Sequence, residues 1–251
     1  MLTLRAAVVA LNLLVVALSA EADSHGPVPS VGLQQHEFVF ARLVYDSGGW
    51  SDWPRWRADW PHAERHFNRG LNRLTRLDAA DDGELVSLQD DRLFDYPWLY
   101  VVEVGALWLN PDEIARLREY LLRGGFLMVD DFHGRQQWLQ FLSVMQQVFP
   151  QRQIADLEDS EELFHVLYDL PDREQIPGIR PLMNNRTYEY GGVVPYWRGI
   201  RDDSGRIMVA INFNMDLGDA WEHADDASYP ERYSAMAYRI GTNYVLYALT
   251  H

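Results

Sequence analysis

The stretch Asn110–Asp131, "NPDEIARLREYLLRGGFLMVDD", combines a complete helix with the strand that follows it. Asn110 is a preferred residue for capping a helix N-terminus, and Pro111 suits the first helical position. The glycine pair Gly124–Gly125 ends the helix. The run "FLMV" is continuously apolar, as in strands that are buried on both faces of a parallel sheet. This stretch therefore predicts an α/β fold.

Working outward, strands and helices alternate along most of the chain. Strands are predicted at residues 37–45, 85–88, 98–107, 126–131 and 206–214, and helices at 61–74, 110–125, 134–149 and 231–249. Residues 156–170 are acidic and partly helical in this interpretation, and residues 171–206 are irregular. Alternation of this kind predicts a three-layer sandwich with a mostly parallel sheet, formed by one domain over residues 37–251.

The composition narrows the possible functions. The chain has 251 residues, 47% of them hydrophobic, which suffices for a single core. Its formal net charge of −15 opposes binding to nucleic acids and to anionic membrane surfaces. The absence of cysteine excludes disulfides, thiol nucleophiles and thiolate metal sites.

The N-terminus resembles a secretory signal. Arg5 precedes the apolar run from Ala6 to Leu18, and Ala20-Glu21-Ala22 has the small-residue pattern of a cleavage site. We expect residues 1–22 to be a signal peptide, residues 23–36 a flexible spacer, and the protein to be exported, to the periplasm. The alternative is an uncleaved N-terminal anchor, which would then be the only membrane attachment.

Polar side chains gather where the predicted strands end. In open α/β sheets, ligands bind beyond the carboxyl ends of the strands. The residues at those ends form the candidate ligand site: Tyr45, Glu103, Asp130, Asp131, His133, Asn212, Asn214 and Asp216. The sequence therefore predicts a cleft at this edge of the sheet.

Asp130, Asp131 and His133 are the candidate catalytic residues. Adjacent carboxylates can bind a hard cation or share a proton, and an imidazole can act as acid, base or ligand. The alternative is that an aspartate caps the helix that starts near Gly134. Because successive side chains of a strand point to opposite faces, we expect only one aspartate to face the cleft.

Two further polar groups have open interpretations. Glu103 interrupts an apolar run, so it is either at the wet end of its strand or paired, for example with Arg42. Asn212, Asn214 and Asp216 would place three oxygen ligands on one strand face. Turn formation explains the same residues, since Asn and Asp both favour turns. Trp221 follows in the same segment and is a further ligand-binding candidate.

A tryptophan-rich loop follows the first predicted strand. Trp50 and Trp53 are the candidate ligand-stacking residues, and Trp56 and Trp60 lie in the same loop. The indoles could cover the cleft or stack on a ligand such as a sugar. They could equally pin the loop to the core.

Motifs for nucleotide cofactors and for serine hydrolases are absent. There is no G-x-G-x-x-G, Walker loop or G-x-S-x-G elbow. We expect no cofactor and assign no metal ligand; a divalent cation remains an option without a specific motif. His62 and His66 only loosely resemble a zincin helix, because no third ligand is indicated.

The chain resembles a known bacterial family. The runs "FVFARLVY", "LFDYPWLYVVEVG" and "LNPDEIARLREYLLRGGFLMVDDF" are similar to those of the family called domain of unknown function 4159. The resemblance covers residues 38–249 and implies a flavodoxin-like fold of the class I glutamine-amidotransferase type. The amidotransferases use a nucleophilic cysteine, and here Asp130–His133 occupies the comparable turn, so glutaminase activity is not implied.

These observations favour a binding or accessory domain of the cell envelope that is not an enzyme. Its partner would be a small polar ligand or an envelope protein. The alternative is a hydrolase, metal-assisted in one version, that acts on glycan or amide bonds through Asp130, Asp131 and His133.

Overall fold

The computed structural model describes residues 35–49 and 53–251 of the chain. The predicted signal peptide, nearly all of the predicted spacer and Trp50 lie outside the described residues. Within the described part, no helix combines the length and the apolar character needed to cross a membrane.

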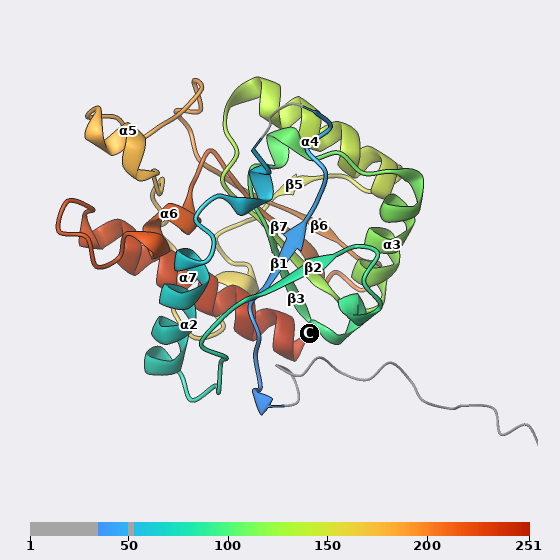
Figure 1. Ribbon diagram of the computed structural model, residues 1–251, viewed down its shortest axis with the longest axis horizontal. Helices are drawn as coiled ribbons and strands as arrows, with labels where there is room; N and C mark the ends of the chain where they lie inside the picture. The colour runs from blue at the N-terminus through green and yellow to red at the C-terminus, as the bar shows by residue number, and fades with distance from the viewer. Residues whose placement is uncertain (1–34, 50–52) are drawn as a thin grey trace, which may run out of the picture.

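A mixed sheet forms the centre of the molecule (Figure 1). Its seven strands in the described residues have the order β2-β1-β3-β4-β7-β6-β5. Their bounds are β1 Ala41–Val44, β2 Glu84–Ser87, β3 Trp98–Val101, β4 Phe126–Val129, β5 Ala155–Asp156, β6 Tyr196–Arg201 and β7 Ile207–Phe213. The first five strands in this order, β2, β1, β3, β4 and β7, pair in parallel. β6 pairs antiparallel with β7, and β5 pairs antiparallel with β6 at the edge of the sheet. The predicted α/β class with a mostly parallel sheet is confirmed, and the antiparallel edge was not predicted.

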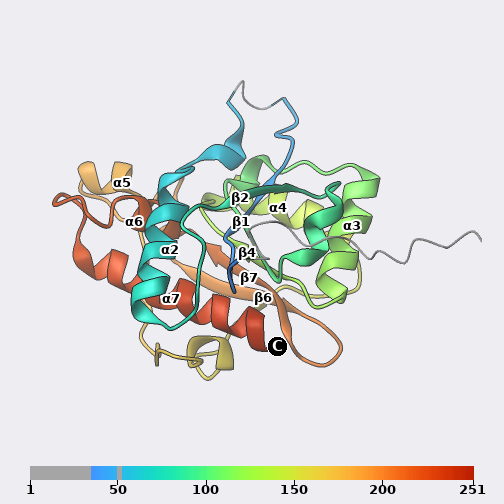
Figure 2. The ribbon, with the colours of Figure 1, turned by 60° about the horizontal axis from the view of Figure 1, so that its bottom comes forward.

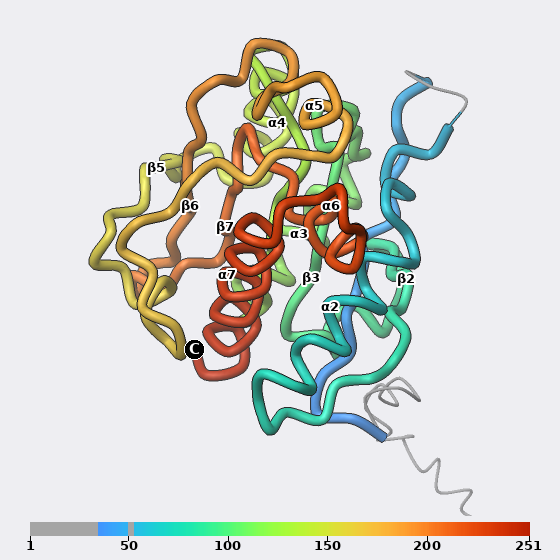
Figure 3. The backbone as a smooth tube through the Cα atoms, turned by 90° about the vertical axis from the view of Figure 1, so that its left-hand side faces the viewer, coloured from blue at the N-terminus to red at the C-terminus, as the bar shows by residue number. Residues whose placement is uncertain are grey.

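Helices cover both faces of the sheet (Figures 1 and 2). Helices α3 and α4 pack on one face, and α2, α6 and α7 pack on the other. Figure 3 shows α6 beside both α2 and α7. The bounds are α2 His62–Leu74, α3 Pro111–Leu122, α4 Gly134–Val148, α5 Ile179–Met183, α6 Leu217–Glu222 and α7 Glu231–Thr250. In the part of the chain that the structure describes, four short 3-10 helices lie in the connections: η1 Arg55–Arg57, η2 Asp91–Asp95, η3 Val104–Ala106 and η4 Glu162–Phe164.

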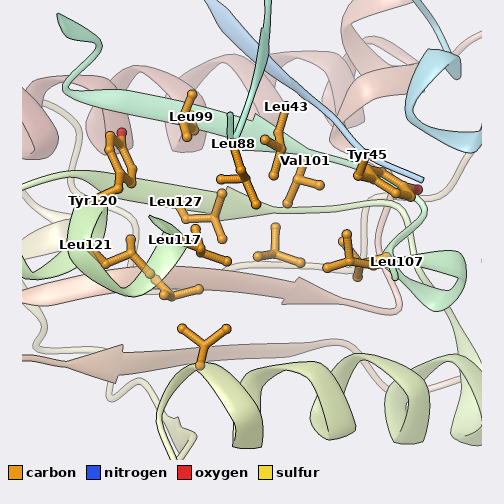
Figure 4. Packing of buried hydrophobic residues seen from close by; sticks show 14 of the residues in the cluster. Leu43, Tyr45, Leu88, Leu99, Val101, Leu107, Leu117, Tyr120, Leu121 and Leu127 are labelled. Carbon is orange, nitrogen blue, oxygen red and sulfur yellow. The ribbon is translucent and has the colours of Figure 1, made fainter. Parts of the chain in front are cut away.

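Side chains of the central strands alternate between two hydrophobic cores. In β4, Leu127 and Val129 join the core under α3 and α4, part of which is shown in Figure 4. Phe126 and Met128 join the core under α2, α6 and α7. All four residues of β4 are buried, which explains why the strand is continuously apolar in sequence.

Helix α3 has the predicted ends. The Asn110 side chain accepts hydrogen bonds from the amides of Asp112 and Glu113, both at 3.0 Å, and Glu113 accepts from the Asn110 amide at 2.9 Å. This capping box satisfies donors that a helix N-terminus leaves free. At the other end, the Arg206 guanidinium donates to the Leu121 carbonyl at 2.8 Å. The decisive stretch therefore forms the predicted helix and strand, although β4 ends at Val129 and not at Asp131.

Other predicted elements differ from the structure. The strand predicted over 98–107 ends at Val101, because Glu103 has a left-handed φ of 53° and the chain then enters η3. Residues 156–170 contain the last residue of β5 and the single turn η4, and the segment 171–206 contains both α5 and β6. Strand β6 is antiparallel and lies next to the edge strand β5, and most of its residues are partly exposed. It therefore lacks the continuous apolar run that marks β4.

Strand order reverses between β1 and β3. The chain passes from β1 to β2 on one side and then returns to β3 on the other side of β1. Such a switch point leaves an opening beyond the carboxyl ends of the strands. A ligand site is therefore expected among the residues that follow β1, β3, β4 and β7.

Candidate functional site

Four strand ends meet at one edge of the sheet. The Tyr45 hydroxyl, after β1, donates to the carbonyls of Val102 and Glu103, both at 2.9 Å. The Glu103 amide, after β3, donates to the Asp131 carbonyl at 3.0 Å. The Asn214 amide, after β7, donates to the Phe132 carbonyl at 3.0 Å. Residues that are distant in sequence are therefore neighbours here, as the parallel arrangement predicts.

A cleft of about 680 Å³ opens at this edge, between η3 and the start of α4. We call it the edge cleft. Glu103 and His133, two of the sequence candidates, line it, and they are joined by Arg55 from η1 and Tyr190 from a loop. The amides of Gln136, Gln137 and Gln140 line the α4 side. This lining offers many hydrogen-bond donors and acceptors.

Glu103 pairs with Arg55 across the edge cleft. Arg55 Nη1 lies 3.1 Å from Glu103 Oε1. Burial raises the pKa of Glu103, and the charge of Arg55 acts against this rise.

The expected pair of Glu103 with Arg42 is wrong. Arg42 lies mid-strand on the α2 face and is fully buried, where it pairs with Glu64 and donates to the carbonyls of Trp56 and Ala58. Glu103 instead follows the end of β3, so the two side chains lie in different parts of the fold.

Asp131 and His133 form a contact pair beside the edge cleft. His133 Nε2 lies 3.2 Å from Asp131 Oδ1. Burial lowers the pKa of His133 to about 4, so its imidazole is neutral at neutral pH. Burial also raises the pKa of Asp131 well above its ordinary value, and the charges of Glu103 and Asp59 add to this effect. The pair therefore offers one neutral ring and one carboxyl that binds protons readily.

Asp130 caps a helix, although not the helix that follows it in sequence. Its Oδ2 accepts from the Tyr100 hydroxyl at 2.7 Å and from the amides of Leu217 and Gly218 at 2.8 and 3.1 Å. These amides belong to the first turn of α6. Helix α4 begins at Gly134 as predicted, but without a side-chain cap bond from either aspartate. The two aspartates thus point to different places, although strand alternation is not the cause, because both follow the end of β4 and Asp131 has a left-handed φ of 46°.

Burial dominates the electrostatics of Asp130. The side chain is fully buried, and its Oδ1 has no hydrogen-bond partner among the described residues. Burial raises the pKa of Asp130 to about 7, against the opposing effect of the hydrogen bonds to Oδ2. A proton on Oδ1 therefore accompanies this carboxyl near neutral pH in a large fraction of molecules.

Further carboxylates converge at the start of α6. Asp59, Asp216 and Asp219 each place one oxygen within 4.8 Å of the others. Asp131 lies close enough for its charge to raise the pKa of Asp216. We call Asp59, Asp131, Asp216 and Asp219 the acidic cluster. Burial, followed by these mutual charges, raises the pKa values of Asp59, Asp131 and Asp216 well above the ordinary value.

Local bonds hold the members of the acidic cluster in place. Asp216 Oδ1 accepts from the Asp219 amide at 2.8 Å and so caps α6. Asp219 Oδ2 accepts from the Ile179 amide at 2.7 Å. Asp59 Oδ2 is closed off from solvent and has no hydrogen-bond partner among the described residues. The cluster therefore contains a buried carboxyl oxygen without a donor.

Two glycines make room for this convergence. A Cβ on Gly178 would come within 2.6 Å of Asp216 Oδ2 and 2.9 Å of Asp219 Oδ2. A Cβ on Gly218 would come within 2.5 Å of Asp59 Oδ2. Real Cβ contacts are essentially never this short, so a larger residue would force the carboxylates apart.

The predicted aromatic candidates do not surround the site. Trp50 lies outside the described residues. Trp53 is 53% exposed, with the Arg57 guanidinium 5.6 Å from its ring. Trp221 is fully buried and packs on Phe67 in the core under α2, α6 and α7, so its indole has no face free for a ligand.

The expected row of three oxygens on one face of the late strand is wrong. Asn212 is buried and its Oδ1 accepts from the Tyr244 hydroxyl at 3.1 Å. Asn214 has a left-handed φ of 65°, and its side chain bonds the Gly134 amide and the Val194 carbonyl. β7 ends at Phe213, so only Asp216 reaches the acidic cluster. Both asparagines are positioned as structural links.

Several site residues were not among the sequence candidates. Asp59 comes from the loop before α2, Asp219 from α6, Arg55 from η1 and Glu189 from a loop. Glu189 lies near both the acidic cluster and the edge cleft. Burial raises its pKa, and the charges of Asp219 from the cluster and Glu103 from the cleft raise it further. The acidic, turn-rich stretch that continues past Asp216 to Asp219 was the sequence signal that could have indicated Asp219.

The fold and this edge define an open-sheet α/β domain with an acidic cluster beyond the carboxyl ends of its parallel strands. The sequence profile of the family described as "Domain of unknown function (DUF4159)" matches residues 39–249, and the chain belongs to this family. The resemblance noted in the sequence is thus confirmed at the family level. No curated protein matches the chain.

Proposed function

We propose that this protein is a binding domain of the cell envelope that holds a divalent cation in the acidic cluster. The edge cleft beside it would take a small polar ligand, and the leading proposal involves no chemical conversion. The observation that carries the proposal is the convergence of Asp59, Asp216 and Asp219, with one oxygen of each within 4.8 Å of the others.

Electrostatics supports a cation at this place. Carboxylates this close repel one another, and burial adds to the free-energy cost of their ionised forms. A bound cation offsets both effects. Because the group contains only oxygen ligands, it suits a hard ion such as Ca²⁺ or Mg²⁺ better than a soft metal. The buried Oδ2 of Asp59, which has no donor among the described residues, is the oxygen with most to gain.

The edge cleft supports a polar ligand. Its side-chain amides, together with the Arg55–Glu103 pair, match the hydroxyls and amides of a sugar or a short peptide. Asp131 contacts His133 of the cleft and also belongs to the acidic cluster. The affinity of the cleft for its ligand would therefore depend on whether the cation site is occupied.

Calorimetry on the purified, chelator-treated protein tests the cation site. We expect saturable binding of Ca²⁺ or Mg²⁺ by the wild type and a loss of about tenfold or more in affinity for Asp219→Asn. Asn keeps an acceptor for the Ile179 amide, so the substitution removes mainly charge. Asp91→Asn is the matched control, because the Asp91 side chain is 96% exposed and remote from the cluster. Absence of binding by the wild type would refute the proposal.

A metal-assisted hydrolase is the second candidate, favoured by the contact between His133 and Asp131 beside the cleft. A neutral imidazole next to a carboxyl can take a proton from water. Hydrolysis of a glycan or peptide library that is lost in His133→Gln, with cation binding retained, would support this candidate. Equal turnover by wild type and variant would exclude this role of His133.

The cellular location and the finer fold class belong to the same proposal. The N-terminal sequence supports export to the periplasm, with an uncleaved N-terminus as the membrane-attached alternative. The order β2-β1-β3-β4-β7 of the parallel strands supports the flavodoxin-like, glutamine-amidotransferase-like class, since it matches the 2-1-3-4-5 order of flavodoxin-like sheets. Cell fractionation with mass measurement of the mature chain tests export and cleavage.

A further inference from the structure

A second concave surface lies away from the acidic cluster, between α2 and α7. This groove has a volume of about 630 Å³. Arg69 and Arg73 line it from α2, and Tyr238 and Arg239 line it from α7. We call it the α2–α7 groove.

The groove carries positive charge that the protein does not neutralise. Arg69, Arg73 and Arg239 make no hydrogen bond or ion pair with residues in the described ranges 35–49 and 53–251. On the same helices, Arg65 pairs with Asp82 and Arg232 with Glu174.

Among the groove-lining residues, the three arginines face a single carboxylate, Asp225, so positive charges exceed negative ones by two. This excess stands out in a chain whose formal net charge is −15.

An aromatic surface forms the apolar part of the groove. A Cβ on Gly70 would come within 2.3 Å of the Tyr238 ring, so the ring lies directly on the backbone of α2. The ring is also parallel to Phe67, with 6.2 Å between their centroids and an interplanar angle of 6°. Gly70 therefore permits the close packing that fixes Tyr238 beside the arginines. Tyr168 adds a second aromatic side chain to the lining.

One further polar group, the His66 ring, is oriented by the backbone so that Nε2 is the acceptor nitrogen of the neutral ring. His66 Nδ1 lies 3.0 Å from the Trp221 carbonyl oxygen and must donate to it, because a carbonyl only accepts. His66 lines the groove, and its Nε2 makes no hydrogen bond within the described residues.

We propose that the α2–α7 groove binds a soluble phosphate monoester that carries an apolar or aromatic group. Guanidinium groups bind phosphate oxygens in a bidentate manner, and an excess of two positive charges matches a phosphate dianion. The Tyr238 ring provides contact for the apolar part of the ester. The protein's overall negative charge disfavours an anionic membrane as the source of the phosphate.

Calorimetric titration with phenyl phosphate, inorganic phosphate and phenol tests this site. We expect the wild type to bind phenyl phosphate more tightly than either fragment, because only the ester uses both charge and ring. The double variant Arg69→Ala/Arg73→Ala should lose about tenfold or more in affinity, since charge-assisted hydrogen bonds are among the stronger polar contacts. Arg76→Ala is the matched control; Arg76 is exposed, follows α2 and does not line the groove.

Circular dichroism and thermal unfolding of each variant establish that the fold is kept. If the double variant is unstable, Arg239→Ala provides an independent removal of charge from α7. The proposal is overturned if wild type and arginine variants bind phenyl phosphate equally, or if Arg76→Ala weakens binding as much. Binding confined to vesicles that contain phosphatidic acid, with none of the soluble ester, overturns it as well.

Discussion

The Tyr100 hydroxyl donates a 2.7 Å hydrogen bond to the carboxylate of Asp130, and both side chains are fully buried. Tyr100 belongs to β3 and Asp130 follows β4, while the same carboxylate oxygen accepts from two amides of α6. This contact therefore fixes the helix that contributes Asp216 and Asp219 to the acidic cluster.

Tyr100→Phe should destabilise the protein by about 2 kcal/mol, because it removes a donor from a buried carboxylate. The change in urea midpoint at pH 8 measures this. Tyr120→Phe is the matched control: Tyr120 is equally buried, but its hydroxyl donates only to the carbonyls of Tyr96 and Phe126, which are neutral. If Tyr100→Phe lowers the free energy of unfolding no more than Tyr120→Phe does, the charge of the acceptor adds nothing to the hydrogen bond, and the prediction is wrong.

The wild type should lose stability as the pH rises, and Asp130→Asn should lose less. The folded pKa of Asp130 is raised to about 7 from 3.8, so between these values the folded state binds more protons than the unfolded state. Stability from this group is therefore complete below pH 3.8 and is lost as the pH rises through 7. The loss amounts to about 4 kcal/mol by pH 8.

Urea unfolding of wild type and Asp130→Asn from pH 4 to pH 8 checks this prediction. His133 has the opposite effect, since its pKa is lowered to about 4 and its contribution is lost as the pH falls below 6.5. Both proteins retain His133, so its direct contribution cancels in the difference between their profiles. That difference reports Asp130 together with Asp131 and Asp216, whose pKa values the Asp130 charge raises. Parallel profiles would show that Asp130 does not titrate in this range.

Divalent cations should raise the melting temperature more at pH 8 than at pH 5. Protons compete with the cation for Asp59 and Asp216, whose pKa values are raised by burial. Differential scanning fluorimetry with CaCl₂ or MgCl₂, against NaCl of equal ionic strength, measures the effect. A shift that is equal at both pH values, or equal with NaCl, would argue against binding in the cluster.

Gly178→Ala should weaken cation binding more than it weakens the fold. Gly178 has a φ of −63°, so alanine suits the backbone, but its Cβ would press on the oxygens of Asp216 and Asp219. We expect a loss of about tenfold in affinity together with a stability change of about 1 kcal/mol. Calorimetry and urea unfolding report the two quantities separately, and unchanged affinity would contradict the proposed geometry.

Glu64→Gln should be strongly destabilising, by about 3 kcal/mol or more, since it leaves the buried Arg42 charge without its partner. Arg42 also donates to the carbonyls of Trp56 and Ala58, which precede Asp59. Urea unfolding measures the stability. Arg42→Met/Glu64→Leu is the comparison, and we expect it to cost less because no buried charge remains alone.

The sequence was most informative where local signals agree with the fold. Asn110, Pro111 and the glycine pair predict α3 because capping depends on neighbouring residues alone. The apolar run of β4 and the parallel topology together predict that Glu103 and Asp131 are neighbours. Local chemistry and one topological rule were sufficient for these features.

Other features depend on contacts between distant segments. Asp59 joins the acidic cluster because Arg42, a buried residue of β1, holds the carbonyls just before it. No local pattern encodes that link. Trp221 was a ligand-binding candidate from the sequence, yet α6 is placed so that its indole packs on Phe67 in the core. The left-handed conformation of Asn214 ends the alternation on which the row of oxygens depended.

Helix α6 belongs to both surfaces of interest. Asp219 is part of the acidic cluster, and two residues later the Trp221 carbonyl orients His66 in the α2–α7 groove. Six residues form little more than one and a half turns, so one short helix joins the two surfaces. If a ligand at one surface changes the affinity for a ligand at the other, the second ligand must change the affinity for the first by the same factor.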